Sequence, residues 1–213
     1  HYPNIKPNIF ALSDGIIEAY SKVNVPKEKL FLTPNGLDNS EYRFVDKPKY
    51  PDRSICIGKI EDRKKQYFLQ GIDSLWFAGN IADARFNQSK NYLGELPKSK
   101  IKTDLTDYGN LVLVSDGEVH PRVCTEALAA GLGVVISECG IANLDLDKEF
   151  ITVIPDSKIN DLEYIQTETI RNRDSSIRNR HAIIDYARQF DWSSIIEKYY
   201  LPSIQKVRSN YDS

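Results

Sequence analysis

The stretch NLVLVSDGEVHPRVCTEALAAGLGVVIS, residues 110–137, contains the pattern that decides the fold. The runs at 110–115 and 133–137 are largely apolar and β-branched without polar alternation, as in strands that are covered on both faces. Residues 121–131 between them have helical spacing, and Pro121 fits a first helical turn. A strand, a helix and a second strand in this order predict one right-handed crossover of a parallel sheet.

Similar apolar runs recur along the chain, with helical patterns between them. The other expected strands are 9–12, 29–33, 54–58, 74–79 and 150–154. The other expected helices are 13–23, 62–71, 97–107 and 159–170, followed by 175–190 and 192–207, which are separated near Asp191. This alternation predicts an α/β fold, in which a Rossmann-like parallel sheet is flanked by helices.

The bulk composition excludes several classes of protein. The chain has 28 Lys+Arg against 30 Asp+Glu, a net charge of −2, so no electrostatic argument favours nucleic acid or an anionic membrane as a partner. No apolar run approaches the roughly 20 residues that cross a bilayer. The 3 cysteines show no CxxC spacing, which indicates neither a disulfide framework nor a zinc site and favours a reducing cytoplasm. The chain has no methionine and begins with His1, as expected of a fragment rather than an intact gene product.

Two loops of such a sheet carry candidate binding residues, because ligands bind at the carboxyl ends of parallel strands. The first loop is GKIEDRKKQ, residues 58–66, where Gly58 allows a tight turn. Lys59 and Lys64 in this loop are spaced so that both can reach one phosphate group. The same pattern also fits a solvated basic surface at the start of a helix, and the stretch alone leaves both interpretations open.

The second loop leads into the helix expected at 121–131. It places Glu118 at the rim of the cleft and Glu126 about one turn into the helix, facing the same cleft. The free N–H groups of residues 122–124 would point at the strand end, where helix N-termini bind anions. The two carboxylates could be metal ligands, an acid/base pair as in glycoside hydrolysis, acceptors for sugar hydroxyls, or only surface charge. Their spacing alone does not decide between these roles. A Mg²⁺ site would be favoured by further acidic residues nearby, and the sequence shows no such acidic cluster here.

Six segments, in this order, resemble the C-terminal, donor-binding half of a GT-B glycosyltransferase of the family 4 type. KLFLTPNGLD resembles the ipNGvD element that ends the acceptor domain, and SICIGKIEDRKK resembles the vGRlxxxKG phosphate loop. SLWFAGN and NYLGEL are similar to the next two strand ends. Glu118 and Glu126 form an E-x7-E element, and FDW at 190–192 resembles the start of the last helix. The resemblance covers nearly the whole chain.

The resemblance implies roles for individual residues. Glu118 would hold the donor sugar, Glu126 would accept hydrogen bonds from the ribose, and Lys59 and Lys64 would neutralise the diphosphate. Glu118, Lys59 and Lys64 are the expected catalytic residues, since preorganised cations stabilise the charge that grows on the leaving nucleoside diphosphate. Besides Glu118 and Glu126, the expected donor-binding residues are Gly58, Gly94, His120, Arg122 and Val123. The family transfers with retention, and it needs no metal and no cofactor besides the donor.

Two departures from the family pattern affect this site. Lys59 stands where the family has arginine, so the charge is kept without the bidentate geometry. Val119, His120 and Pro121 replace glycines that let the backbone approach the sugar, which narrows or reshapes the expected sugar pocket. His120 would either touch the sugar or the diphosphate there, or belong to the protein surface.

The resemblance divides the chain into three parts. Residues 1–45 are a remnant of the acceptor domain with its linking element, 46–190 the nucleotide-sugar-binding Rossmann-like domain, and 191–213 the C-terminal crossover helix. A polar, proline-rich segment at 47–54 is the best linker candidate. Without the rest of an acceptor domain, the chain is expected to bind the donor but to transfer poorly alone. Its exposed remnant is also expected to pair with a second copy.

The expected function is therefore transfer of a sugar from a nucleotide sugar to a sugar or lipid-linked acceptor, in polysaccharide or glycan biosynthesis. The expected location is the cytoplasm, at the inner face of a membrane where the acceptor is lipid-linked. One alternative is a non-catalytic nucleotide-sugar-binding or assembly module, which the changes at 119–121 and the missing domain favour. Others that keep the fold are a nucleotide-sugar epimerase, which needs acid/base residues across the cleft, and a sugar phosphorylase, which needs a cofactor lysine. The sequence leaves the base and the sugar of the donor open.

Overall fold

The computed structural model describes residues 7–88, 90–118 and 121–209. It contains two parallel sheets with helices packed on them, which confirms the α/β fold. The small sheet consists of β1 (Ile9–Ala11) and β2 (Leu30–Leu32). The large sheet has the order β4-β3-β5-β6-β7, with β3 at Tyr50–Ile57, β4 at Leu75–Ala78, β5 at Tyr108–Leu113, β6 at Gly133–Ser137 and β7 at Ile151–Ile154. Each strand pair of the large sheet is parallel.

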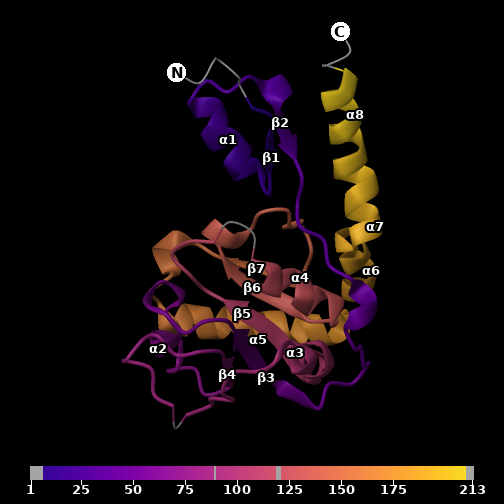
Figure 1. Cartoon of the computed structure of the whole chain (residues 1–213). Helices are drawn as coiled ribbons and strands as arrows, with labels where there is room; N and C mark the ends of the chain where they lie inside the picture. Colours follow the sequence, from indigo (N-terminus) through magenta and orange to yellow (C-terminus); the bar gives the residue numbers. More distant parts are fainter. Residues whose placement is uncertain (1–6, 89, 119–120, 210–213) are drawn as a thin grey trace.

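Helices connect the strands and flank both sheets (Figure 1). The first four are α1 (Asp14–Lys22), α2 (Gln66–Leu69), α3 (Lys98–Asp104) and α4 (Arg122–Ala129). The C-terminal part contains α5 (Leu162–Arg178), α6 (Arg180–Ala187), α7 (Trp192–Ile195) and α8 (Leu201–Ser209), with a π-helical turn, Ile196–Tyr200, between the last two.

The strand order creates a switch point beside β3. From β3 the chain first adds β4 on one side of that strand, and it then crosses back to place β5 on the other side. In open α/β sheets, ligands bind outside the carboxyl ends of the strands at such a point. The loops that follow β3 and β5 are the two loops singled out by the sequence, and they begin side by side here.

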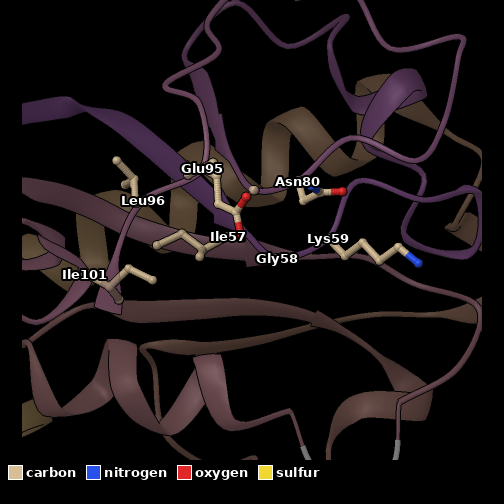
Figure 2. A pocket seen from close by; sticks show the side chains of 9 residues that line it. Ile57, Gly58, Lys59, Asn80, Glu95, Leu96 and Ile101 are labelled. Atoms are coloured by element: carbon tan, nitrogen blue, oxygen red, sulfur yellow. The ribbon is translucent and has the colours of Figure 1, made fainter. Parts of the chain in front are cut away.

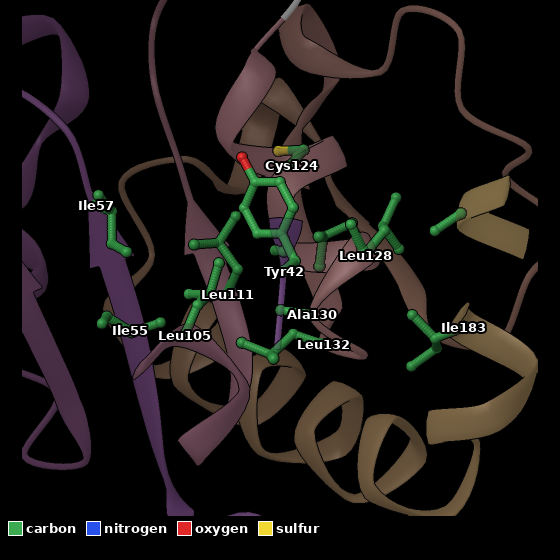
Figure 3. Close-up of a cluster of buried hydrophobic side chains, with 14 of the residues drawn as sticks. Tyr42, Ile55, Ile57, Leu105, Leu111, Cys124, Leu128, Ala130, Leu132 and Ile183 are labelled. Atoms are coloured by element: carbon green, nitrogen blue, oxygen red, sulfur yellow. The ribbon is translucent and has the colours of Figure 1, made fainter. Parts of the chain in front are cut away.

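Neighbouring residues of each central strand belong to two buried layers. Leu111 packs with Leu128 of α4 and Ile183 of α6 in the layer that Figure 3 shows. Val112, the next residue of β5, packs with Ile165 of α5 on the opposite face of the sheet. Because both faces are covered, Leu111, Val112 and Leu113 follow one another as apolar residues, and this is why the strand patterns do not alternate. Asn110, which precedes them, is polar but buried, and its side-chain amide donates to the carbonyl of Thr169 at 3.0 Å.

Helix α5 is longer than the sequence pattern predicted. It continues to Arg178 instead of ending at 170, and the break before α6 falls at Asn179. The polar residues 171–174 resemble a loop, but Asn172 is 1% exposed, and its side-chain amide donates to the carbonyls of Val134 at 3.1 Å and Phe150 at 3.0 Å. One turn further on, the buried hydroxyl of Ser176 donates to the carbonyl of Gly109 at 2.7 Å and accepts from the N–H of Gly133 at 2.7 Å. Buried polar residues with satisfied hydrogen bonds therefore extend the helix where hydropathy predicted its end.

Two other segments also differ from the prediction. The helix expected at 62–71 is a 3-10 turn, Asp62–Lys64, followed by α2, because Lys65 between them has a left-handed backbone with φ of 50°. Strand β3 begins at Tyr50, inside the segment predicted as a linker. A proline is tolerated there because the pairing with β5 is irregular between Tyr50 and Ser54.

The C-terminal helices run from the large sheet back along the small one (Figure 1). Their start is fixed to the segment between β2 and β3. Leu37 N–H in this segment donates to the carbonyl of Phe190 at 2.9 Å, and Trp192 N–H donates to the carbonyl of Leu37 at 3.0 Å. Gly36 lies under the Trp192 ring, and a Cβ at Gly36 would be 2.7 Å from it. The segment NGLD and the segment FDW, far apart in the sequence, therefore form one joint.

Candidate functional site

Two glycines hold the carboxyl ends of β3 and β4 together. Gly58 and Gly79 both have positive φ, at 147° and 149°. Gly58 N–H donates to the carbonyl of Ala78 at 3.0 Å. A Cβ on Gly79 would lie 1.9 Å from the carbonyl oxygen of Gly58. Side chains are therefore excluded at this point, and the two strand ends form the floor of a cleft.

Buried Gln66 fixes the loop that follows β3. Its amide donates to the carbonyl of Lys59 at 3.0 Å and accepts from the N–H of Glu61 at 3.2 Å. Lys64 extends over Gly58, with its Nζ 3.0 Å from the place of a Cβ there. Lys59 instead is 59% exposed, and its Nζ pairs with the Glu61 carboxylate at 3.6 Å. The two predicted lysines thus come from one loop but have different surroundings.

Glu118 lies between two cations of this loop. Its Oε1 is 3.4 Å from Lys64 Nζ and 3.3 Å from Arg63 Nη1. Arg63 also donates to the carbonyl of Gly117, and its Nε pairs with Glu61 at 2.7 Å. Lys64 and Glu118 are only 13% and 14% exposed, so their contact is better shielded than an ordinary surface ion pair. Arg63 stands at a variable position of the phosphate-loop motif, so the motif did not single it out as a binding residue.

The first turn of α4 completes a cavity of about 240 Å³ at the carboxyl ends of β3 and β5. We call it the Lys64 cavity. It is lined by Gly58, Lys64, Glu118, Arg122, Val123 and Glu126, together with Ile57, Leu113 and Pro121. Most of the predicted donor-site residues therefore share one cavity. His120 and Val119 lie outside the described residues.

One part of the prediction for α4 is wrong. The N–H of Cys124 is not free, because it donates to the carbonyl of Pro121 at 3.0 Å and closes the first turn of the helix. Its side chain is 1% exposed and faces the core, where burial raises the pKa of the thiol. Within the described part of the chain, the N–H groups of Arg122 and Val123 have no hydrogen-bond partner, so two donors rather than three remain for an anion.

Tyr42, from the segment that joins the two sheets, reaches Glu126 from the core side. Its ring is buried beside Leu111 and Leu128 (Figure 3), and its hydroxyl donates to the Glu126 carboxylate. Burial and the negative charge of Glu126 raise the pKa of Tyr42, so its hydroxyl remains a donor at neutral pH. No local pattern predicts this contact, because the two residues belong to segments far apart in the sequence.

A second cavity, of about 320 Å³, lies on the other side of the Gly58 floor. We call it the Glu95 cavity; it is lined by Ile57, Gly58, Lys59, Ala78, Gly79, Asn80, Glu95, Leu96 and Ile101 (Figure 2). It shares Ile57 and Gly58 with the Lys64 cavity, so the two cavities adjoin at this point. Gly94 supports its wall: its φ is 80°, and its carbonyl accepts from the N–H of Gly79 at 3.0 Å.

A third cavity, of about 520 Å³, separates the small sheet's unit from the large one. We call it the Asp14 cavity. Its lining includes Ser13 and Asp14 at the start of α1, Glu118, and Cys139 and Asn143 after β6. Asn143 also joins the two units, since its side-chain amide donates to the carbonyl of Leu12 at 3.0 Å. Glu118 is therefore the point at which the Asp14 and Lys64 cavities meet.

No group of three or more His, Cys, Asp or Glu side chains among the described residues could hold a metal ion. None of the helices in the described ranges is long and apolar enough to cross a membrane. The cleft offers a shielded lysine and free helix N–H groups, which bind anions, and carboxylates, which accept hydrogen bonds from hydroxyls.

No protein-family model and no curated protein matches the sequence. Solved structures do match the fold. HepE from Anabaena in complex with UDP has a TM-score of 0.71 at 15% identity, over 94% of this chain and 63% of its own. The lipopolysaccharide outer core galactosyltransferase WaaB has a TM-score of 0.69 at 15% identity, over 92% and 60%. Sucrose-phosphate synthase from Thermosynechococcus elongatus has 0.65 at 19%, over 95% and 58%.

These neighbours are GT-B glycosyltransferases, and the parallel five-stranded sheet with its flanking helices matches their domains. At 15–19% identity, this likeness shows the fold alone. The chain spans 58–63% of the length of these three structures. The fold is thus that of a GT-B glycosyltransferase domain, over a part of such a protein's length.

Proposed function

We propose that the chain is the donor-binding half of a glycosyltransferase, which binds a nucleoside-diphosphate sugar and transfers its sugar with retention and without a metal. The observation that carries this proposal is the Lys64 cavity, where Lys64, Glu118 and Glu126 meet the N-terminus of α4 at the switch point of the sheet. A cation, free helix N–H groups and two carboxylates are the groups that would bind a diphosphate and the hydroxyls on both sides of it.

The cleft can accommodate the parts of a nucleotide sugar in sequence. The diphosphate would lie over Gly58, between Lys64 and the free N–H groups of Arg122 and Val123. Glu126, oriented by Tyr42, would accept hydrogen bonds from the ribose. The base would enter the Glu95 cavity, whose walls at Ile57, Leu96 and Ile101 are apolar.

The same geometry suits the chemistry of sugar transfer. Negative charge grows on the nucleoside diphosphate as its bond to the sugar breaks, so a preorganised cation beneath it stabilises the transition state more than the ground state. Lys64 has this position, and Lys59, at the outer side of the loop, adds positive charge near the same end of β3. Glu118 would hold the sugar at the border of the Asp14 cavity, from which an acceptor would approach.

The known structures support the choice of donor. HepE from Anabaena has been solved with UDP and with UDP-glucose, and the pneumococcal O-GlcNAc transferase GtfA with UDP and GlcNAc. For the present chain we propose only the same class of ligand, a nucleotide sugar, and we do not specify its base.

The acceptor and the partners are a further part of the proposal. The chain covers 58–63% of the length of these neighbours, and transfer would need an acceptor-binding domain that faces the cleft. We propose a sugar or lipid-linked acceptor, and a cytoplasmic site of action at the inner face of a membrane when the acceptor is a lipid. Phe10 and Val23 on the small unit are 49% and 68% exposed, and they form part of a surface that could pair with a second copy.

A nucleotide panel tests the proposal. Thermal shifts are measured with UDP, GDP, ADP and TDP and their sugar conjugates on the wild type and on Glu126→Ala. Binding at about 100 times Kd adds roughly 2.7 kcal/mol to stability, which raises the Tm of a domain this size by several degrees. We expect a shift with one base, and its loss in Glu126→Ala. Glu197→Ala, which removes an exposed carboxylate on the C-terminal helices, is the matched control and should keep the shift.

The alternative function is a binding or assembly module without transfer, which the replaced glycines at 119–121 favour. Both functions predict nucleotide binding, so a second experiment separates them. The chain is mixed with a fuller acceptor domain and the bound nucleotide sugar, and release of nucleoside diphosphate is followed. Turnover that Glu118→Ala abolishes supports the transferase, whereas binding without turnover supports the module. No shift with any nucleotide contradicts both.

A further inference from the structure

Three charged atoms meet at the mouth of the Lys64 cavity. Glu118 Oε1 is 3.4 Å from Lys64 Nζ, which extends over Gly58, and 3.3 Å from Arg63 Nη1. A negatively charged oxygen therefore occupies a position between two cations. Phosphate oxygens form short, charge-assisted hydrogen bonds with the same pair of cations, so the carboxylate marks a place where a phosphate oxygen fits.

Arg63 does not depend on Glu118 for its position. The N–H of Asp116 donates to the carbonyl of Arg63 at 2.8 Å, and Lys65 Nζ pairs with the Asp116 carboxylate at 3.1 Å. The guanidinium group also donates to the carbonyl of Gly117. These contacts join the loop after β3 to the loop after β5, so the guanidinium would stay beside the cavity if Glu118 turned away.

Lys59 differs from Arg63 in its contacts rather than in its exposure. Both side chains are about half exposed and pair with Glu61, Arg63 through Nε at 2.7 Å and Lys59 through Nζ at 3.6 Å, but only Arg63 of the two is paired with Glu118 among the described residues. Lys59 lines the Glu95 cavity instead. Figure 2 shows it extending away from Leu96 and Ile101 on the opposite wall. An ammonium group is a point charge, whereas the planar fork of a guanidinium presents several donors to one phosphate group.

We infer that Arg63, rather than Lys59, is the second cation of the diphosphate site, and that the diphosphate displaces Glu118 from Arg63 and Lys64. The inference rests on the proposed function. Once displaced, the Glu118 carboxylate would accept hydrogen bonds from the hydroxyls of the donor sugar instead of pairing with the two cations. Glu118 would therefore compete with a nucleoside diphosphate without a sugar for Arg63 and Lys64, but it would help to bind a nucleotide sugar.

If the diphosphate displaces Glu118, removal of the Glu118 charge should strengthen diphosphate binding. A purely structural role for Arg63 predicts no such gain. Glu118→Gln removes the competing charge while keeping the size of the side chain, so it should strengthen binding of the nucleoside diphosphate by about three- to ten-fold. The gain should be smaller for the nucleotide sugar, which loses a hydrogen-bond acceptor. It should also shrink in the double variant with Arg63→Ala, because one of the two freed cations is then missing.

The test is calorimetric titration of the full chain with the nucleoside diphosphate that gives the largest thermal shift, and with its sugar conjugate. Arg63→Ala should weaken binding by about ten- to a hundred-fold, as expected for a lost hydrogen bond to a charged group. Arg63→Lys should recover part of this loss, and Lys59→Ala should cost about two-fold. Arg171→Ala, which removes an exposed arginine of α5, controls for net charge and should change nothing.

The outcomes separate this inference from the proposed function. If the wild type binds no nucleotide, both fail. If the wild type binds, but Lys59→Ala weakens binding at least as much as Arg63→Ala, only the assignment of Arg63 fails. A Glu118→Gln variant that binds the diphosphate no better than the wild type overturns the exchange. Because Glu118→Gln tests for a gain, its result stands even if Arg63→Ala proves to be misfolded.

Discussion

The α-carbon of Gly79 lies against the carbonyl group of Gly58, so closely that a Cβ at Gly79 would be 1.9 Å from that oxygen. This contact brings the carboxyl ends of β3 and β4 together and forms the floor on which the Lys64 and Glu95 cavities meet. A small change at this one position should therefore affect both stability and the cleft.

Gly79→Ala should lower the free energy of unfolding by about 3 kcal/mol, because it adds a backbone clash to the strain of a φ of 149°. Gly94→Ala is the matched control. Gly94 also has positive φ, at 80°, but a Cβ there meets nothing within 4 Å, so we expect a cost of only about 1 kcal/mol. Urea unfolding followed by circular dichroism measures both, and equal losses would contradict the role assigned to the contact.

Tyr42→Phe should weaken nucleotide binding by about three- to ten-fold and cost about 1 kcal/mol of stability, since Glu126 loses the hydroxyl that orients it. Titration calorimetry with the nucleotide of choice measures the first effect and thermal unfolding the second. Tyr20→Phe, at a 40% exposed tyrosine of α1, should change neither. Unchanged affinity in Tyr42→Phe would show that Glu126 does not need this partner.

Arg180→Met should destabilise the chain by about 3–5 kcal/mol. Arg180 is 2% exposed, and its guanidinium donates to the carbonyls of Val45 at 2.8 Å and Thr106 at 2.9 Å, so both acceptors lose their donor. Burial lowers the pKa of Arg180 to about 10, which still leaves it charged at neutral pH. Arg178→Met, at an exposed position on the preceding helix, should stay within about 0.5 kcal/mol in the same urea titration.

Asp191 gives a pH-dependent prediction. The N–H and hydroxyl of Ser193 donate to its carboxylate, with a further bond from the N–H of Asn39, and together they lower the pKa of Asp191 against the effect of burial. A depressed carboxyl pKa contributes stability above the unfolded-state pKa of about 4, and this contribution disappears as the pH falls through the folded-state value.

Asp191→Asn keeps a side-chain oxygen that can cap the helix but removes the negative charge, so it should cost roughly 0.3–1 kcal/mol at pH 7 and progressively less as the pH falls below 4. Urea titrations at pH 7, 5 and 3 measure the difference from the wild type. Asp147→Asn, at an exposed aspartate after β6, should show no such dependence. A difference that stays constant with pH would mean that the charge of Asp191 contributes nothing.

Much of the fold could be predicted from the sequence, because a strand that is covered on both faces is apolar at successive positions rather than at alternate ones. The runs at 54–58, 110–115 and 133–137 are such strands, and the structure contains β3, β5 and β6 there. The end of the helix expected at 159–170 could not be predicted, since the side chain of Asn172 is polar but is buried and hydrogen-bonded to the carbonyls of Val134 and Phe150.

The sequence by itself determined which residues stand at the ends of these strands. Gly58, Lys64, Glu118 and Glu126 were expected at one edge of the sheet because parallel strands all end there, and the pairing of β3 with β5 in the structure brings them into one cavity. Only the tertiary structure decided that Arg63 rather than Lys59 lies beside Glu118, and that Tyr42 supports Glu126. Those contacts join loops and segments far apart in the chain. Their geometry depends on how the backbones of two loops pack, which no local pattern records.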